Sequence, residues 1–121
     1  MIKELLFFFA SPMIEYIIHK SLHEYKNTFH REHHILISNR NNDRELWILY
    51  FLLPSIYFEN YYLVIGLTRY YIAHYLIHFY PHLVKGLTKH HLEHHKNCST
   101  NFAVSATYPD YLFSYIYTLL Q

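Results

Sequence analysis

Residues 90–95 read HHLEHH, and residues 29–34 read FHREHH. In each stretch one histidine is followed three and four positions later by two more. The two triplets are His30, His33 and His34, and His91, His94 and His95. On an α-helix these offsets place side chains on one face. The stretches therefore predict two helices, each directing three imidazoles the same way.

Histidine pairs at helical spacing precede each triplet. His19 and His23 come before the first, and His74 and His78 before the second. All 12 histidines of the 121-residue chain lie in two windows, 19–34 and 74–95. Four predicted helical faces therefore carry ten imidazoles.

The composition limits the class of protein. A length of 121 residues allows one domain, 1–121. Because 52% of residues are apolar, 20% are aromatic and only two are glycine, disorder and flexible linkers are excluded. The net charge of +1 argues against a nucleic-acid partner, which needs a basic excess. The single cysteine, Cys98, excludes a disulfide framework and a multi-cysteine zinc module.

Two apolar tracts predict membrane segments. The first, at about 2–18, approaches the length of a bilayer span and lacks the features of a cleaved signal peptide. The second, at about 46–80, is divided by Pro54 and by Glu59 and Asn60. It is either one kinked span or a short hairpin. The C-terminal run at 111–120 is too short to span and is predicted to pack at the membrane interface.

The distribution of basic residues favours the hairpin. Lysines and arginines accompany both histidine windows, whereas none occurs between Glu45 and Thr68. By the positive-inside tendency both windows face the cytoplasm, so the tract between them enters the membrane and returns near Glu59 and Asn60. The predicted fold is an all-α, integral-membrane helical bundle, multi-pass, in which cytosol-facing histidine-rich helices form a di-metal site.

Imidazole suits iron, zinc or copper, and a helical bundle can direct ligands from several helices into one centre. Ten nitrogens exceed the needs of one ion, which predicts two metals with four or five imidazoles each. Such a site at a membrane surface is typical of the activation of dioxygen or water.

Other interpretations explain fewer residues. A lone histidine on a helix is usually a core residue, and a metal-buffering tract is usually low-complexity. His90, Glu93 and His94 fit the inverted zinc-protease pattern, with Glu93 as general base, but leave the other ten histidines unused. His30 and Glu32 fit half of a nucleobase-deaminase motif whose cysteine half is absent.

The four histidine strings together resemble the fatty acid hydroxylase superfamily, which includes sterol desaturases and C-4 methyl oxidases. The strings are EYIIHKSLH at 15–23, FHREHH at 29–34, HYLIH at 74–78 and HHLEHH at 90–95. The tail NFAVSATYPDYLF at 101–113 is similar to the family's ending, although Ala103 replaces a common glycine. The likeness covers about residues 15–114.

The resemblance implies metal ligation by His19, His23, His30, His33, His34, His74, His78, His91, His94 and His95. It implies two ions, iron or alternatively zinc, and the hydroxylation or desaturation of a lipid such as a fatty acyl chain or sterol by O2. Electrons would come from a membrane-bound b-type cytochrome or similar donor. The implied location is the endoplasmic reticulum.

Three further residues are candidates for the catalytic site. Glu15 and Tyr70 lie four positions before His19 and His74, and Asp110 follows Pro109. Either carboxylate is placed to orient an imidazole through its second nitrogen. The alternatives are a partly solvated Glu15, a packing role for Tyr70 and a turn role for Asp110.

Two questions stay open at this level. His82 and His90 lie outside the minimal pattern, and His90 is a candidate for hydrogen bonding rather than ligation. The alternative function is a catalytically silent, metal-binding membrane protein or an accessory subunit of a larger homologue.

Overall fold

The computed structural model describes residues 1–35 and 48–121. Its helices are α1 (Ile2–Glu24), α2 (Thr28–Ile35), α3 (Ile48–Tyr57), α4 (Tyr61–Phe79), α5 (Lys85–Lys96) and α6 (Tyr108–Leu119). The described residues contain no strand, so the predicted all-α class is confirmed. The first two residues of the predicted second apolar tract, 46 and 47, lie outside the described residues.

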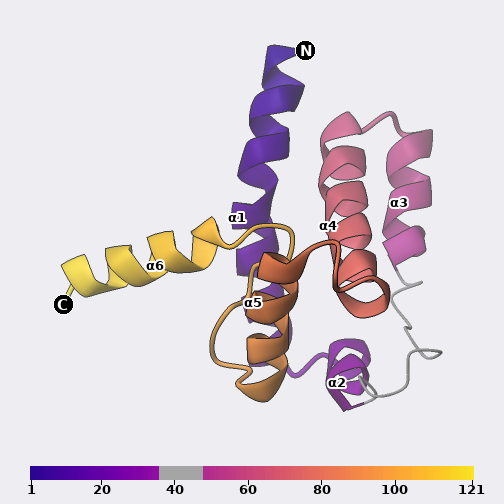
Figure 1. The fold of residues 1–121 in the computed structure, drawn as a ribbon. Helices are drawn as coiled ribbons and strands as arrows, with labels where there is room; N and C mark the ends of the chain where they lie inside the picture. Colours follow the sequence, from indigo (N-terminus) through magenta and orange to yellow (C-terminus); the bar gives the residue numbers. More distant parts are fainter. Residues whose placement is uncertain (36–47) are drawn as a thin grey trace.

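Helices α1, α3 and α4 stand side by side, and α2 and α5 lie toward the end of α1 where the histidines occur (Figure 1). Helices α3 and α4 form an antiparallel hairpin that turns at residues 58–60. Glu59 adopts a φ of 53°, and the Asn60 side chain accepts a hydrogen bond from the Leu63 amide at 3.2 Å, which caps α4. The hairpin turn therefore occurs where the sequence predicts it.

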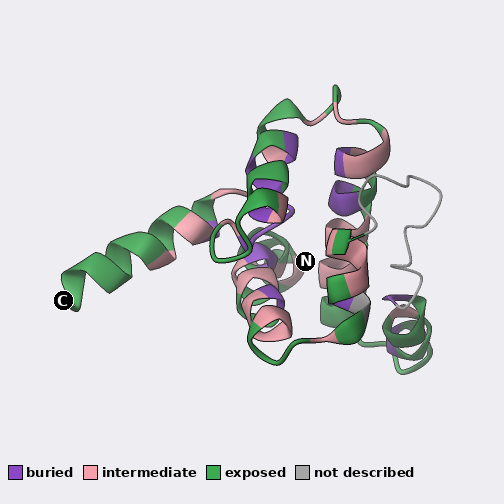
Figure 2. Cartoon of the chain, turned by 90° about the horizontal axis from the view of Figure 1, so that it is seen from below, coloured by how far each residue is buried: buried purple, intermediate pink, exposed green. Residues whose placement is uncertain are grey.

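The interior of this fold is polar. The buried apolar residues are Ile48, Ala73, Ile77, Phe102, Ala103 and Val104, together with Pro12 and Pro109. The buried polar residues include six histidines, namely His19, His30, His74, His90, His91 and His94. Buried positions lie on the inward faces of the helices, while α6 is largely exposed (Figure 2). The helices thus enclose imidazoles as much as aliphatic side chains.

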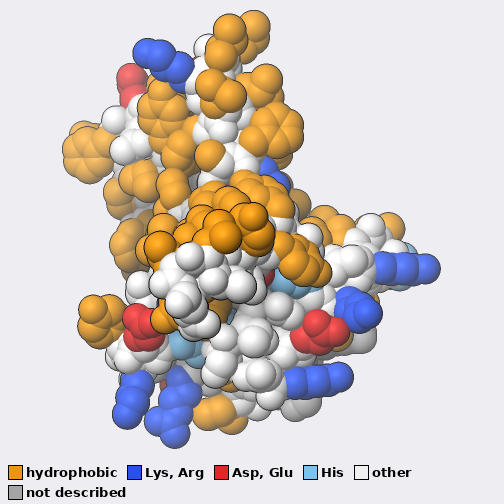
Figure 3. Space-filling view, turned by 90° about the vertical axis from the view of Figure 1, so that its left-hand side faces the viewer, with side chains coloured by type: hydrophobic (Ala, Val, Ile, Leu, Met, Phe, Trp, Pro, Cys, Tyr) orange, Lys and Arg blue, Asp and Glu red, His pale blue; other side chains and the backbone are white. Residues whose placement is uncertain are grey.

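Apolar side chains instead cover much of the outside. Leu6, Phe9 and Ile17 of α1 are each more than half exposed, as are Phe51 and Leu53 of α3. Figure 3 shows apolar side chains gathered over the upper part of the molecule, with most lysines and arginines of that face at the opposite end. This segregation is typical of a protein with one end in an apolar medium.

Among the described residues, α1 is the one helix long and apolar enough to cross a membrane. Only 17% of its apolar window is buried inside the structure, unlike the core helix of a water-soluble domain. Helix α3, with ten residues, is too short to span, and α4 carries Arg69 and two histidines. A single such helix among the described residues does not support the multi-pass arrangement predicted from the sequence.

Helix α6 projects sideways from the body, roughly across the direction of α1 (Figure 1). It contains most of the C-terminal run predicted to lie at a membrane interface. Its apolar residues Tyr111, Tyr115 and Leu119 are each at least 63% exposed. Helix α6 therefore presents an apolar surface that the rest of the described structure does not cover.

Candidate metal centre

The ten histidines that the sequence predicts as ligands converge in two sets of five, each able to hold a metal ion. Group 1 consists of His19, His23, His30, His34 and His94. Group 2 consists of His33, His74, His78, His91 and His95. Within each group, one possible ligand atom from every residue lies within 4.8 Å of all the others. The histidine clusters are thus positioned to hold metal ions.

Four helices supply these side chains, and the helices differ in the group to which they contribute. Helix α1 contributes only to group 1 and α4 only to group 2, whereas α2 and α5 contribute to both. The neighbours His33 and His34 point to different groups because successive helical residues are about 100° apart. His94 and His95 divide in the same way. Each predicted triplet is therefore split between the groups.

The two groups adjoin. The rings of His34 in group 1 and His95 in group 2 have centroids 4.3 Å apart. The rings of His91 and His94, which also belong to different groups, are 5.9 Å apart. Such proximity makes one binuclear centre, rather than two remote sites, the arrangement that these side chains can form.

Spacing between the nitrogens matches the needs of a bound ion. In group 1 the Nε2 atoms of His19 and His30 are 2.8 Å apart, and those of His23 and His94 are 2.9 Å apart. In group 2 the corresponding distance is 3.1 Å between His74 and His91. Two nitrogens each about 2.1 Å from one metal ion are about 3.0 Å apart when they subtend a right angle. The observed separations fit such a centre.

Hydrogen bonds fix the tautomers of two imidazoles in group 1. The Nδ1–H of His19 donates to the carbonyl of Phe102, and the Nδ1–H of His94 donates to that of Thr100 at 2.6 Å. With the proton on Nδ1, the neutral ring presents an unprotonated Nε2 toward its group. Each of these lone pairs can accept from the N–H of a neighbouring imidazole or bind a cation. The donor set therefore fits a metal ion.

The environment of group 1 also opposes protonation. Burial, together with neighbouring histidines, lowers the pKa of His30 to about 2 and that of His34 to about 3. Burial lowers the pKa of His94 to about 4, against the hydrogen bond to Thr100, which raises it. These imidazoles are neutral at physiological pH, the form that binds metals.

Glu15 and Asp110 contact a backbone loop in the structure, at residues 101–105. Glu15 accepts hydrogen bonds from the amides of Val104 and Ser105 at 2.9 and 2.8 Å. Asp110 accepts from the amides of Phe102 and Ala103 at 2.7 and 3.0 Å. The second nitrogen of His19 is bonded to a carbonyl of this same loop rather than to Glu15. Both carboxylates therefore lie one contact further from the group 1 imidazoles than the sequence predicts, although Asp110 contacts the His90 ring directly.

Tyr70 lies against group 2, its ring stacked on that of His74 with centroids 5.5 Å apart. His90 belongs to neither group and donates from Nε2 to Asp110 at 2.9 Å. Glu93 accepts from the Asn101 side chain at 3.3 Å, so the inverted zinc-protease pattern is not assembled as a site. His82 is exposed.

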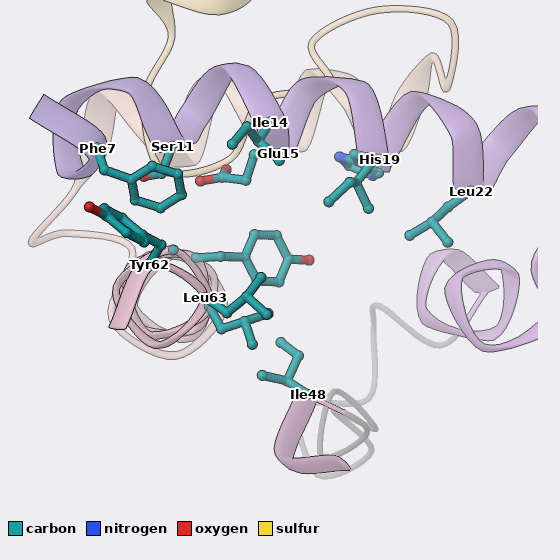
Figure 4. A pocket seen from close by; sticks show the side chains of 13 residues that line it. Phe7, Ser11, Ile14, Glu15, His19, Leu22, Ile48, Tyr62 and Leu63 are labelled. Atoms are coloured by element: carbon teal, nitrogen blue, oxygen red, sulfur yellow. The ribbon is translucent and has the colours of Figure 1, made fainter. Parts of the chain in front are cut away.

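An apolar cavity of about 140 Å³ lies between α1 and α4, with Ile48 of α3 at its side. Figure 4 shows Phe7 of α1 facing Tyr62 of α4, with Ser11, Ile14 and Glu15 further along α1. Its lining also includes His19 and Tyr70. The cavity therefore extends from the apolar half of the molecule to residues of, or beside, both histidine groups.

Three contributors to this site are absent from the sequence predictions. The carbonyls of Thr100 and Phe102 accept from histidines of group 1, and backbone carbonyls leave no sequence signal. Arg69, within the apolar length of α4, donates to the Ser105 hydroxyl at 3.0 Å and to its carbonyl at 3.2 Å. An arginine in an apolar helix is a recognisable signal, because such a charge requires partners.

No family model, curated protein or solved structure matches this chain.

Proposed function

We propose that this chain is a membrane-bound di-iron oxygenase that hydroxylates or desaturates a lipid, using O2 and electrons from an external donor such as a b-type cytochrome. The observation that carries the proposal is the convergence of ten imidazoles in two adjoining groups of five at the inner end of an apolar cavity. The resemblance of the histidine strings to the fatty acid hydroxylase superfamily adds to it.

The imidazoles of groups 1 and 2 would each hold one ion. When bound, two ferrous ions supply the redox chemistry by which O2 oxidises an unactivated C–H bond. The chain itself contributes neutral nitrogen donors, held on four helices and shielded by burial. A donor set of five imidazoles without a carboxylate favours iron or zinc over magnesium or calcium. Iron is the proposed ion because zinc does not change its oxidation state.

The cavity between α1 and α4 supports a lipid substrate. Its walls are almost entirely apolar, and aliphatic side chains such as Ile14, Ile18 and Leu67 are suited to an alkyl chain. An alkyl chain seated there would exclude water from the space beside His19 and Tyr70. The shape of the apolar walls, rather than hydrogen bonds to the substrate, would thus position one carbon of the alkyl chain near the metal centre.

Membrane attachment is the other part of the proposal. We place α1 across the bilayer and the turn of the α3–α4 hairpin within it, in the endoplasmic reticulum. The histidine groups then lie at the cytoplasmic face, where basic residues such as Lys20, Lys89 and Lys96 also occur. This orientation is supported by the exposed apolar surface of α1 and α3.

Lipid profiling of cells tests the proposed activity. Cells that express the chain are compared with cells that express a His33→Ala, His34→Ala double variant, which removes one imidazole from each group. We expect hydroxylated or newly unsaturated lipids only with the native chain. His82→Ala is the matched control because His82 is exposed and outside both groups.

Purified protein provides the second measurement. The native chain should contain two metal ions and convert a lipid in the presence of O2 and a competent electron donor. Two bound ions without any turnover would instead favour a silent metal-binding protein or accessory subunit. One ion or none, with no turnover, would refute the di-metal oxygenase.

A further inference from the structure

The 101–105 loop is buried and contacts group 1 through both its backbone and a side chain. Phe102, Ala103, Val104 and Ser105 are each at most 8% exposed. The Phe102 carbonyl accepts the Nδ1–H of His19, and the carbonyl preceding the loop, of Thr100, accepts that of His94. The loop, through Phe102, and the residue before it, Thr100, therefore determine which nitrogen of two group 1 imidazoles faces the centre.

The Phe102 ring reinforces this contact. Its centroid lies 6.0 Å from that of His19, 5.9 Å from that of His23 and 5.5 Å from that of His94. All three histidines belong to group 1. The histidine rings that Phe102 contacts thus all belong to group 1.

Two carboxylates hold this loop from opposite sides. Four successive amides, those of residues 102–105, donate to Asp110 and Glu15, two to each. Asp110 belongs to the first turn of α6 and Glu15 to α1, so the loop is held between two helices. Hydrogen bonds from an amide to a charged acceptor are stronger than neutral ones. The loop position is therefore set by these two charges.

Further contacts tie the loop to α5 and α4. The Asn101 backbone has a φ of 57°, and its side-chain amide donates to the His90 carbonyl at 3.1 Å. His90 itself donates to Asp110 at 2.9 Å. Arg69 holds Ser105 from α4. Asp110 of α6 therefore holds residues 102 and 103 of the loop, whereas Glu15 of α1 and Arg69 of α4 hold its other end at Ser105.

We propose that Asp110 and Glu15 are positioning residues for one metal site only, acting on group 1 through the backbone of the 101–105 loop. This inference rests on the metal-binding part of the proposed function. Outer partners of ligating histidines orient the ring and raise its basicity, and their loss typically costs about 10- to 100-fold in metal affinity. Group 2 serves as an internal reference within the same chain.

The test uses Co²⁺, whose visible absorption reports its ligand field, and the full chain purified in detergent. One background carries His78→Ala and His95→Ala, which leaves group 1 intact; the other carries His23→Ala and His34→Ala, which leaves group 2 intact. Asp110→Asn is introduced into each. We expect the Kd for Co²⁺ to rise about 10- to 100-fold in the first background and at most about twofold in the second.

Glu15→Gln provides an independent variant at the other side of the loop, with the same expected selectivity. Glu24→Gln is the matched control, because Glu24 is an exposed carboxylate on the same helix, paired with Lys20 at 3.9 Å. Helicity measured by circular dichroism identifies a variant that fails to fold. If Asp110→Asn fails to fold, Glu15→Gln, which retains the Asp110 contacts, tests the inference alone.

Equal weakening in both backgrounds would overturn the inference, since it would indicate a general structural role. Unchanged binding in the group 1 background would overturn it as well. If the native chain binds two Co²⁺ ions and the selectivity is present, the inference holds even where lipid turnover is absent. If the native chain binds no metal, the proposed function fails at its first premise and the inference fails with it.

Discussion

At the residue scale, histidines that are neighbours in the sequence belong to different groups. His33 and His34 are sequence neighbours on α2, yet the first faces group 2 and the second faces group 1. His94 and His95 on α5 repeat this division. A single substitution in either pair therefore removes a ligand from one group only, so mutation can separate the two sites.

Single variants should consequently remove different metals. We expect His33→Ala to weaken the ion at group 2 and His34→Ala to weaken the ion at group 1, each by more than about 10-fold, because one of five nitrogen ligands is lost. Metal titration of each purified variant measures the two affinities. His82→Ala should bind as the native chain does. Loss of both ions in either variant would contradict independent sites.

Acidification should destabilise the metal-free chain. The pKa values of His30 and His94, about 2 and about 4, lie below the 6.5 of the unfolded chain because burial opposes the charged form. The unfolded chain therefore takes up protons first, so these groups leave stability intact above about pH 6.5 and reduce it as the pH falls toward 4. Each contributes up to about 1.4 kcal/mol per pH unit.

Thermal unfolding followed by circular dichroism measures this effect. The Tm of the metal-free protein should be nearly constant above about pH 6.5 and fall steadily from about pH 6.5 to about pH 5. A Tm that is constant or rises over this interval would show that the imidazoles are not buried as neutral groups.

At the element scale, the cavity depends on the close approach of α1 and α4. Gly66 of α4 lines it, and a Cβ added there would lie 3.5 Å from the Phe7 ring, an ordinary contact. An alanine therefore fits, whereas a larger side chain must enter the cavity or separate the helices. The small residue keeps the space beside His19 and Tyr70 open.

Filling this space should abolish lipid conversion without removing the metals. We expect Gly66→Leu to lower turnover at least about 10-fold while metal content stays native, because a leucine side chain displaces an alkyl chain from the cavity. Gly86→Leu is the matched control: Gly86 is also helical, and nothing lies within 4 Å of its added Cβ. Native turnover in Gly66→Leu would exclude this cavity as the substrate site.

At the scale of the whole molecule, apolar surface and charge lie at different ends. The chain should therefore stay with membranes after washing with high salt and leave them only in detergent. Arginines introduced at Leu6 and Phe9, both at least 60% exposed on α1, should release it, since each costs about 2.5–3.5 kcal/mol at a bilayer centre.

Cell fractionation measures the effect, and the metal content of the released variant should remain native because α1 carries its histidines at the other end. Extraction of the native chain by salt alone would contradict membrane insertion and favour a water-soluble metalloprotein.

The sequence by itself determined the helices, the one-sided display of each histidine pair and the hairpin turn at Glu59 and Asn60. These features depend on local geometry: residues three or four apart on a helix share a face whatever surrounds it. The polar pair that divides the second apolar tract is an equally local signal, whereas Pro54, also predicted to divide it, lies inside α3. For this reason the ten histidines are recognisable as one set from their spacing alone.

Only the tertiary structure decided which imidazoles share a group and what the carboxylates contact. The spacing of His30, His33 and His34 allows one common centre or two, and the tertiary structure selects two, with the histidines of α1 in group 1 and those of α4 in group 2. Glu15 reaches a loop about 90 residues away, a pairing that no local rule contains. Long-range packing alone brings those atoms together.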